Sequence, residues 1–366
     1  MVIGVGILLI GPTYTRSDEG SGMDTSSGGP SRQPETHAGE PRRRRRWPFV
    51  VGGLVALGLV GLAVFAAVLI VIATSGPTAP AAYDEEYVSG HGSDKIVVVP
   101  VEGTIASADD SLGGTQPTVT PEGLSDALDQ AAGDPSVVAV VLEINSPGGG
   151  VTASDEMHQS ILDFENKTGE PVVVSMQDVT ASGGYYISTA ADRIVANPTT
   201  LTGSLGVIFE FNNFAEAANK YGIKQVVIKS GKYKDIGSAF REMTPKERDI
   251  FQSIVDESYA KFVDVISEGR HIPKERVRQI ADGRVYSGEQ AKRLGLVDSF
   301  GGLDEASAVA GKLAGTTDTT VVRYVQQPSL TDTLLARLAP QKPQAEQILD
   351  AAGLNLEPKP YYLYRP

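Results

Sequence analysis

A serine followed by two glycines stands where a predicted strand meets a predicted helix. The apolar run from Pro171 to Met176 predicts the strand, and the small residues from Tyr185 to Ala191 predict the helix, so Ser182 lies on the turn between them. A serine on such a turn can act as a nucleophile, with neighbouring backbone N–H groups facing an oxyanion. The alternative is a glycine-rich turn whose serine caps the helix. This segment alone leaves both interpretations open.

A second glycine-rich turn, Ser146 to Gly150, follows the most apolar predicted strand, Val137 to Ile144. Ligands bind at the carboxyl ends of parallel strands, where two such turns can direct N–H groups at one carbonyl oxygen. The arrangement suits acyl transfer, because negative charge then develops on oxygen. A phosphate cradle is the less favoured alternative, because the lysine of the Walker pattern is absent. Further nucleophile candidates, better suited to turn or helix-surface roles, are Ser146, Ser188 and Ser204.

A nucleophilic serine needs a base. Of the four histidines, only His158 is near these turns in sequence, and its place on a predicted helix favours a solvated role. The segment from Lys229 to Asp235 offers three lysines instead. A lysine is a base only when neutral, so its pKa must fall from about 10.4 toward about 7–8 through burial beside apolar groups. For each lysine the alternative is a solvated surface charge.

Composition excludes several classes of protein. The 366 residues contain no cysteine, which excludes a disulfide scaffold, a thiol nucleophile and a thiolate metal site. We predict no metal and no cofactor. The net charge of −13 argues against nucleic acid as a partner. The length allows one large domain or two small ones with appendages.

The N-terminal region predicts a membrane anchor. Phe49 to Thr74 is a stretch of 26 residues without a charge, and a helix of that length spans about 39 Å, more than the roughly 30 Å hydrocarbon core of a bilayer. Five arginines, Arg42 to Arg46, precede it, and 75–82 contain no lysine or arginine. The positive-inside rule then predicts a single-pass protein of the cell membrane with a cytoplasmic N-terminus and an extracytoplasmic catalytic domain. A cleavable signal peptide is the alternative.

The chain divides into five predicted segments. The first, 1–46, is rich in Ser, Gly, Pro and charge and is predicted to be a disordered cytoplasmic tail. Within it we predict that Met23 is the true start and that 1–22 is an upstream extension that is not translated. The other segments are a transmembrane helix at 47–74, a linker at 75–94, a peptidase-sized catalytic domain at 95–325 and a C-terminal extension at 326–366.

Strands alternate with helices through the catalytic domain, which predicts a largely parallel α/β sheet. Further strands are predicted at 96–101, 193–196, 225–228 and 319–324, and further helices at 121–132, 152–164, 214–221, 244–269, 273–281, 287–294 and 303–313. The longest helix begins at Thr244, with Pro245 in its first position and Glu247 completing a capping box.

Several motifs in the same order resemble the signal peptide peptidase A family. They are Ile144 to Gly150, Asp178 to Tyr186, Thr202 to Ile208, Ser230 to Gly237 and, toward the C-terminus, Asp282 to Asp298. The resemblance runs from about Lys95 to Val309. It implies a Ser-Lys serine protease with a Clp-protease/crotonase-like α/β fold of repeated β-β-α units. Matched residue by residue, Ser182 corresponds to the nucleophile, Lys234 to the general base, and Gly149 and Gly183 to the oxyanion-hole donors.

The resemblance also implies partners. These are peptide substrates such as signal-peptide remnants, the lipid bilayer, and further copies of the chain in a homo-oligomeric ring, where the lysine of one subunit can complete the serine of another. The terminal Tyr361 to Tyr364 resembles the aromatic tail of some members, and is either a disordered end or a segment that lies in the substrate groove and is trimmed. A crotonase-like acyl-CoA enzyme and an inactive membrane scaffold are the alternatives. The predicted membrane span argues against the first, and the presence of both Ser182 and Lys234 against the second.

Overall fold

The computed structural model describes residues 58–59, 61–62, 83–107, 118–326 and, as backbone, 361–363. The chain divides into two units, 1–74 and 75–366. Nearly all of the predicted transmembrane helix lies outside the described residues, as do the predicted tail at 1–46 and most of the C-terminal extension. Within the described part, no helix combines the length and the apolarity needed to cross a membrane.

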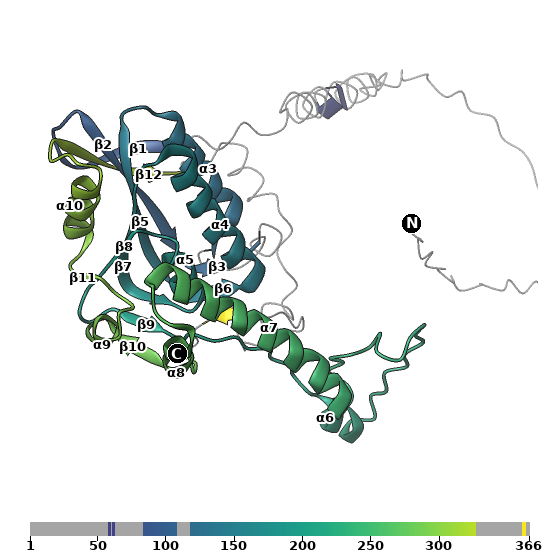
Figure 1. Ribbon diagram of the computed structural model, residues 1–366. Coiled ribbons are helices and arrows are strands. Elements are labelled where there is room, and N and C mark those ends of the chain that lie inside the picture. The colour runs from purple at the N-terminus through teal and green to yellow at the C-terminus, as the bar shows by residue number, and fades with distance from the viewer. Residues whose placement is uncertain (1–57, 60, 63–82, 108–117, 327–360, 364–366) are drawn as a thin grey trace, which may run out of the picture. The chain divides into compact units, whose positions relative to one another are not determined.

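The second unit is built on a large mixed sheet (Figure 1). In the described residues the sheet has nine strands, with the main order β1-β12-β2-β5-β7-β8-β11, while β9 pairs with β7 and β10 with β9. Only the pairs β1–β12 and β9–β10 within this described sheet are antiparallel. The strands are β1 (Asp84–Gly90), β2 (Asp94–Glu102), β5 (Val137–Ser146), β7 (Val172–Ala181), β8 (Arg193–Ala196), β9 (Leu201–Gly203), β10 (Val285–Ser287), β11 (Ser299–Phe300) and β12 (Thr319–Val325). The predicted parallel α/β core is therefore confirmed.

Two long strands each continue into a short second strand. β3 (Thr104–Ile105) follows β2, and β6 (Gly148–Gly150) follows β5. With β4 (Thr118–Val119) and β13 (Tyr361–Leu363) they form a second sheet in the order β13-β6-β3-β4. The helices α3 (Pro121–Gly133) and α4 (Val151–Thr168) come next in the chain. Thus β5, β6 and α4 form one β-β-α unit, and β2, β3 and α3 form another that is interrupted by β4.

Helices cover both faces of the large sheet because its central strands are apolar on both sides. Along β2, Ile96 and Val98 face the core that contains Ala306 of α10 (Leu303–Leu313), while Val97 and Val99 face the larger core under α3 and α4. Figure 1 shows α10 on one side of the sheet and α3 with α4 on the other. Strands buried on both faces read as continuous apolar runs, which is why they were predictable.

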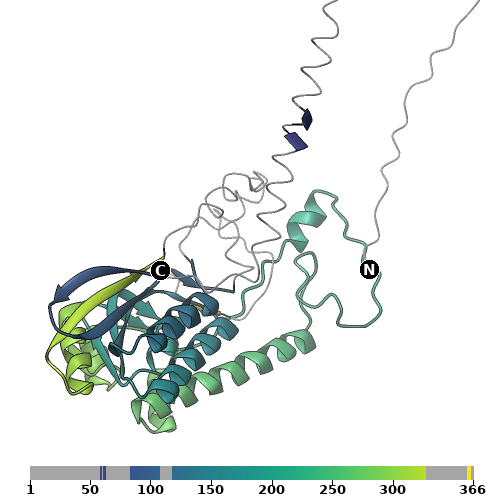
Figure 2. The same cartoon turned by 90° about the horizontal axis from the view of Figure 1, so that it is seen from above.

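The remaining helices are α5 (Gly183–Ser188), α6 (Ala215–Lys220), α7 (Pro245–Arg270), α8 (Lys274–Ile280) and α9 (Gly288–Arg293). The predicted capping box opens α7, with the side chains of Thr244 and Glu247 each bonded to the other's backbone N–H. The buried apolar residues of α7, Phe262 among them, all lie in its C-terminal half. Its N-terminal half and α6 extend away from the sheet (Figures 1 and 2).

Two predicted elements differ from the structure. No strand forms at 225–228, where Val226 is 85% and Ile228 97% exposed; apolar residues alone do not make a strand without a neighbouring strand to pair with. Conversely, β1 lies inside the predicted linker 75–94 and pairs with β12, so the sheet begins before Lys95. The Pro, Gly and Ser content of 75–94 predicted a linker, but 84–90 is held by its pairing with β12, to which an ion pair between Glu85 and Lys95 at 2.8 Å is added.

The carboxyl group of Glu165 on α4 links folding stability to pH. Its Oε1 atom is buried without a hydrogen-bond partner in the described structure. Burial, together with the nearby carboxylate of Asp192, raises the pKa of Glu165 from 4.5 to about 8. A carboxyl group whose pKa is raised by folding contributes stability below its unfolded pKa, and that contribution is lost as the pH rises through the folded pKa.

We therefore expect Glu165→Gln to flatten the loss of stability between pH 5 and pH 9, because glutamine keeps the shape of the protonated carboxyl group without the charge. The measurement is the thermal unfolding midpoint across this range. Glu156→Gln, at an exposed position of the same helix, is the matched control and should follow the wild type. Parallel pH profiles for wild type and Glu165→Gln would contradict the assignment.

Candidate active site

Ser182 lies on a strained turn between β7 and α5. Its backbone has φ 54° and ψ −115°, and a positive φ is unfavourable for any residue other than glycine. Two hydrogen bonds fix the turn: the Ser182 N–H donates to the carbonyl oxygen of Gly203 at 2.8 Å, and the Ser182 carbonyl accepts from the N–H of Tyr186 at 2.8 Å. The strand-to-helix turn predicted from sequence is therefore present, and β9 holds it from the side.

The hydroxyl group of Ser182 is buried and has no hydrogen-bond partner among the described residues. Ser182 occupies the N-cap position of α5, yet its side chain makes no capping bond, so the helix-cap interpretation is wrong. A buried polar group without a partner costs about 1–3 kcal/mol. Strain and an unpaired hydroxyl at one residue are typical of a side chain kept for chemistry.

The two glycine-rich turns meet beside Ser182. Ser146 and Thr180 are in register across β5 and β7, and a Cβ atom added to Gly184 would lie 2.9 Å from the carbonyl oxygen of Ser146. Gly149 and Gly183, the predicted oxyanion donors, are both buried in these turns. At Gly149 and Gly184 glycine is needed because the backbones of neighbouring elements approach too closely for a side chain.

The hydroxyl groups of two other candidate serines, Ser146 and Ser188, have hydrogen-bond partners. The Ser146 hydroxyl accepts a hydrogen bond from the N–H of Gly148 at 3.1 Å. The Ser188 hydroxyl donates to the carbonyl of Gly184 at 2.7 Å, within α5. Ser204 lies just after β9 with φ 52°. The Ser146 bond agrees with a turn role, whereas Ser188 is buried and does not have the helix-surface role predicted for it. Ser182 remains the strongest nucleophile candidate.

The three lysines between α6 and α7 differ in their contacts. Lys229 forms an ion pair with Asp235 at 2.6 Å, and the Lys232 ammonium lies 5.3 Å from the ring centre of Tyr233. The Lys234 side chain is exposed and, within the described structure, has no such partner. It is also not bonded to the Ser182 hydroxyl of its own chain. Figures 1 and 2 show the α6–α7 segment standing away from α5.

His158 is buried rather than solvated, contrary to the sequence interpretation. It is 6% exposed and its ring meets the ring of Tyr186 edge-on at 5.3 Å. Burial lowers the pKa of His158 to about 4, so the imidazole is neutral near pH 7. It does not bond Ser182, whose hydroxyl has no partner in the described residues, and therefore does not form a Ser-His pair here.

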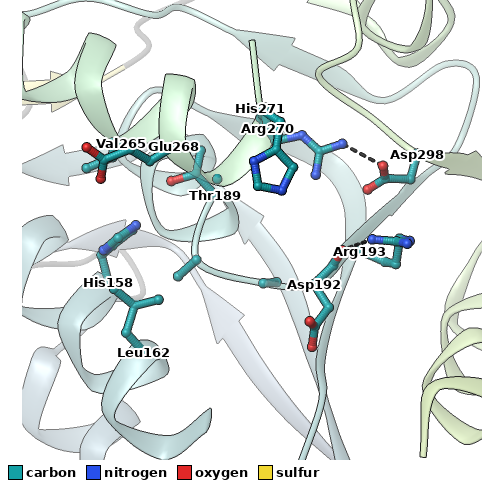
Figure 3. A pocket seen from close by; sticks show the side chains of 13 residues that line it. His158, Leu162, Thr189, Asp192, Arg193, Val265, Glu268, Arg270, His271 and Asp298 are labelled. Atoms are coloured by element: carbon teal, nitrogen blue, oxygen red, sulfur yellow. Dashed lines mark hydrogen bonds and ion pairs between the residues drawn. The ribbon is translucent and has the colours of Figure 1, made fainter. Parts of the chain in front are cut away.

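A cavity of about 400 Å³ lies at the C-terminal end of α5, opposite to Ser182 at its N-terminal end. Figure 3 shows that residues of α4, the turn after α5 and the last turn of α7 line it. Arg270, whose side chain is buried, forms an ion pair with Asp298 at 2.7 Å on one side. No residue predicted for catalysis lines this cavity, so it is separate from the candidate active site.

The C-terminal strand lies on the strand that carries Gly149. β13 pairs antiparallel with β6, with Tyr361 opposite Gly150, Tyr362 opposite Gly149 and Leu363 opposite Gly148. For 361–363 the disordered-end interpretation is therefore wrong. Adding an extended segment to a sheet edge is a common way to bind a peptide. The edge of β6 can thus accept an extended peptide next to the Ser182 turn.

Comparison with known proteins now decides the family. The sequence model of "Peptidase family S49" matches residues 165–317. A signal peptide peptidase SppA of Enterococcus faecium is 34% identical, and the match covers 66% of this chain and 70% of that protein. The chain belongs to peptidase family S49. The resemblance to the signal peptide peptidase A family is therefore confirmed, and it places the chain among proteases rather than acyl-CoA enzymes.

Two further proteins match part of this chain. A protein of Methanocaldococcus jannaschii that is named as a protease is 41% identical over 54% of this chain, and the chain spans 63% of its length. Among solved structures, a ClpP1 variant from Listeria monocytogenes matches 57% of this chain and 93% of its own, with 19% identity and a TM-score of 0.38. The architecture of the S49 chain described above is mixed α/β.

Sequence reasoning missed three parts of this site. It recognised Thr202 to Ile208 only as a motif and did not foresee the hydrogen bond from the Ser182 N–H to the Gly203 carbonyl. It recognised the capping box of α7 but not the contacts of Arg241, which lies before it. It left open whether the terminal tyrosines are disordered or lie in the substrate groove, and it did not identify β6 as the strand they pair with, although their β-forming composition was a usable signal.

Proposed function

We propose that this chain is a membrane-anchored serine endopeptidase with a Ser-Lys dyad. It would cut extended, mostly apolar peptides such as cleaved signal peptides. The observation that carries the proposal is the buried, unpartnered hydroxyl of Ser182 on a strained turn, beside a strand that already pairs with an extended segment of the chain. Membership of the S49 family supports the reaction class.

The proposed chemistry follows from the arrangement of these groups. A peptide pairs with β6 and brings its carbonyl carbon to the Ser182 hydroxyl. The Ser182 oxygen attacks this carbon while Lys234 takes the hydroxyl proton, and the N–H groups of Gly149 and Gly183 stabilise the oxyanion. The peptide C–N bond then breaks and the amine leaves with a proton from Lys234. A water molecule hydrolyses the resulting ester and regenerates Ser182.

Covalent labelling tests the nucleophile. A fluorophosphonate reacts with an activated serine, and peptide mass mapping locates the adduct. We expect a single adduct on Ser182 in the full-length protein, and a strongly reduced yield in Lys234→Ala because the base is lost. An adduct on Ser146 or Ser204, or hydrolysis that persists after Ser182 is fully labelled, would overturn the proposal.

We further propose that Lys234 of one subunit completes Ser182 of another in a homo-oligomeric ring. Lys234 belongs to the segment between α6 and α7, and this segment stands away from α5, the helix that begins directly after Ser182 (Figures 1 and 2). The same segment exposes large apolar side chains that a second subunit can cover, namely Tyr221, Ile223, Val226 and Ile228. A lysine on a segment that also exposes large apolar side chains is the arrangement that a shared site requires.

Mixed oligomers test this sharing. Ser182→Ala and Lys234→Ala chains are each inactive under the proposal, and a mixture contains sites with an intact serine from one chain and an intact lysine from the other. We expect the mixture to recover a fraction of wild-type activity after subunit exchange. Absence of recovery in oligomers shown by mass spectrometry to contain both chains would place the dyad within one subunit.

The terminal strand predicts self-processing. Because β13 pairs with β6, the bonds around residues 361–363 lie where a substrate would lie. We expect the active protein to lack its last residues, whereas Ser182→Ala keeps them. Intact-mass measurement of both proteins, purified in the same way, checks this. Identical full-length C-termini would contradict trimming.

The remaining assignments extend the sequence analysis. We propose that 47–74 anchors the chain in the cell membrane, with 1–46 cytoplasmic and the catalytic domain outside, and that the fold is of the Clp-protease/crotonase type. The basic residues before the span support the orientation, and the successive β-β-α units support the fold type. Protease added from outside should degrade the catalytic domain in intact spheroplasts. Full protection of the domain would contradict the proposed orientation and indicate the opposite one.

A further inference from the structure

One arginine ties the lysine-bearing segment to α7. The Arg241 guanidinium donates to both carboxylate oxygens of Glu247, at 2.8 and 2.6 Å. It also donates to both carboxylate oxygens of Asp235, at 3.2 and 3.0 Å, and to the Asp235 backbone carbonyl at 2.9 Å. Asp235 is the residue directly after Lys234. Bidentate pairs of this kind fix geometry as well as charge.

Turns and side-chain contacts, rather than a helix or a strand, hold the shape of this segment. Residues 221–244 contain no helix or strand, and Lys234 lies in a series of turns. The Lys234 N–H donates to the carbonyl of Gly231 at 3.2 Å, and Lys229 adds its ion pair to Asp235. Beyond Asp235, Gly237 has φ 78°, and a Cβ atom there would lie 2.9 Å from the ring of Phe211. Two anchored positions, Asp235 and Gly237, therefore follow Lys234 in the chain.

The ion pairs of Arg241 with Asp235 and Glu247 persist over a wide pH range. The Arg241 guanidinium and the Lys229 ammonium hold the pKa of Asp235 at about 2. Arg241, together with the Thr244 backbone, likewise holds the pKa of Glu247 at about 2. The groups that face Asp235 are thus the two cations, and those that face Glu247 are Arg241 and Thr244. Neither carboxyl group titrates near the pH at which a lysine base would.

We propose that Arg241 is a positioning residue for the Ser-Lys reaction: its bridge from Asp235 to Glu247 fixes the backbone beside Lys234 and so sets where the lysine amino group is presented. This inference rests on the proposed function. Helix capping alone does not account for the bridge, because Glu247 and Thr244 complete the capping box between themselves, whereas Arg241 adds the link to Asp235.

Steady-state kinetics of the full-length protein on one peptide ester test the inference. Arg241→Ala should lower kcat by at least about 10-fold, toward the roughly 10²–10⁴-fold that a lost general base costs, with little change in KM. Arg241→Lys keeps the positive charge but cannot form the bidentate hydrogen bonds of the guanidinium, and its kcat should lie between those of Arg241→Ala and the wild type. Asp235→Asn cuts the link at its other end without disturbing Glu247, and should lower kcat in the same way.

The pH dependence separates positioning from structural damage. A displaced base changes the pH at which kcat/KM is half-maximal, whereas partial unfolding lowers the amplitude and leaves that pH unchanged. Arg248→Ala is the matched control, because Arg248 is an exposed arginine of α7, the helix to which Arg241 links the segment, and it should behave as wild type. The thermal midpoint and oligomer size of every variant are measured alongside.

Lys234→Ala, assayed in parallel, distinguishes two kinds of failure. If Lys234→Ala keeps wild-type activity, the proposed dyad fails and the inference falls with it. If Lys234→Ala is inactive while Arg241→Ala and Asp235→Asn keep wild-type kcat and pH profile, the dyad stands and the positioning role is overturned. The positioning role is supported if Arg241→Ala and Asp235→Asn both lose kcat with a shifted pH profile and Arg241→Lys restores part of kcat.

Discussion

Ser182→Ala is expected to remove peptide hydrolysis, with a loss of kcat of about 10³-fold or more, because no acyl-enzyme can form. Lys234→Ala is expected to lose about 10²–10⁴-fold, the usual contribution of a general base. The double variant should be no worse than Ser182→Ala alone, since the two groups act in one step. Alanine at 182 keeps the strained backbone of the turn, so Ser182→Ala should fold and assemble normally.

Hydrolysis of a chromogenic peptide ester by the purified full-length proteins provides the measurement. Lys232→Ala, on the same exposed segment as Lys234, is the matched control and should retain activity. Ser188→Ala removes a buried hydroxyl from α5 and controls for general damage near the turn. Undiminished activity of either Ser182→Ala or Lys234→Ala would refute the dyad.

Gly149→Ala is expected to have an effect of similar size through a different cause. A Cβ atom at this position would lie 1.8 Å from the carbonyl oxygen of Ile105 in β3, so β6 must move. That shift displaces the Gly149 N–H from the position proposed for the oxyanion donor, and losing one such donor costs about 10²–10³-fold in kcat. It also disturbs the edge on which β13 lies.

Gly150→Ala provides the comparison. At Gly150 the nearest neighbours of an added Cβ atom are 3.8 and 3.9 Å away, which is ordinary contact, and the backbone has φ −61°. We expect its kcat to stay within a few-fold of wild type. The two variants are compared by kcat on the peptide ester and by fluorophosphonate labelling. Equal activities of Gly149→Ala and Gly150→Ala would contradict the role given to Gly149.

Local patterns in the sequence were sufficient to predict the centre of the fold. Strands such as β2 and β5 are apolar on both faces, and the capping signal at Thr244 lies within four residues. The glycine turns after β5 and β7 were also predictable, because each is a short run of glycines directly after an apolar strand. The serine turn, the order of the elements and the family thus follow from residues that are neighbours in the chain.

The tertiary structure decided everything that depends on distant partners. Whether Val226 and Ile228 form a strand depends on a neighbouring strand, which is absent from the described residues around them. His158 became a buried residue because Tyr186 packs against it. The pairing of β13 with β6 joins segments that are far apart in the chain.

The same distinction holds for the candidate site. The sequence by itself determined Ser182, the two glycine turns and a lysine-bearing segment, since each is a short motif with local meaning. Only the folded chain showed that the Ser182 hydroxyl has no partner in the described structure and that Arg241 links Asp235 to Glu247. Hydrogen bonds of this kind need atoms placed within about 3 Å, and only the packing of distant segments sets such positions.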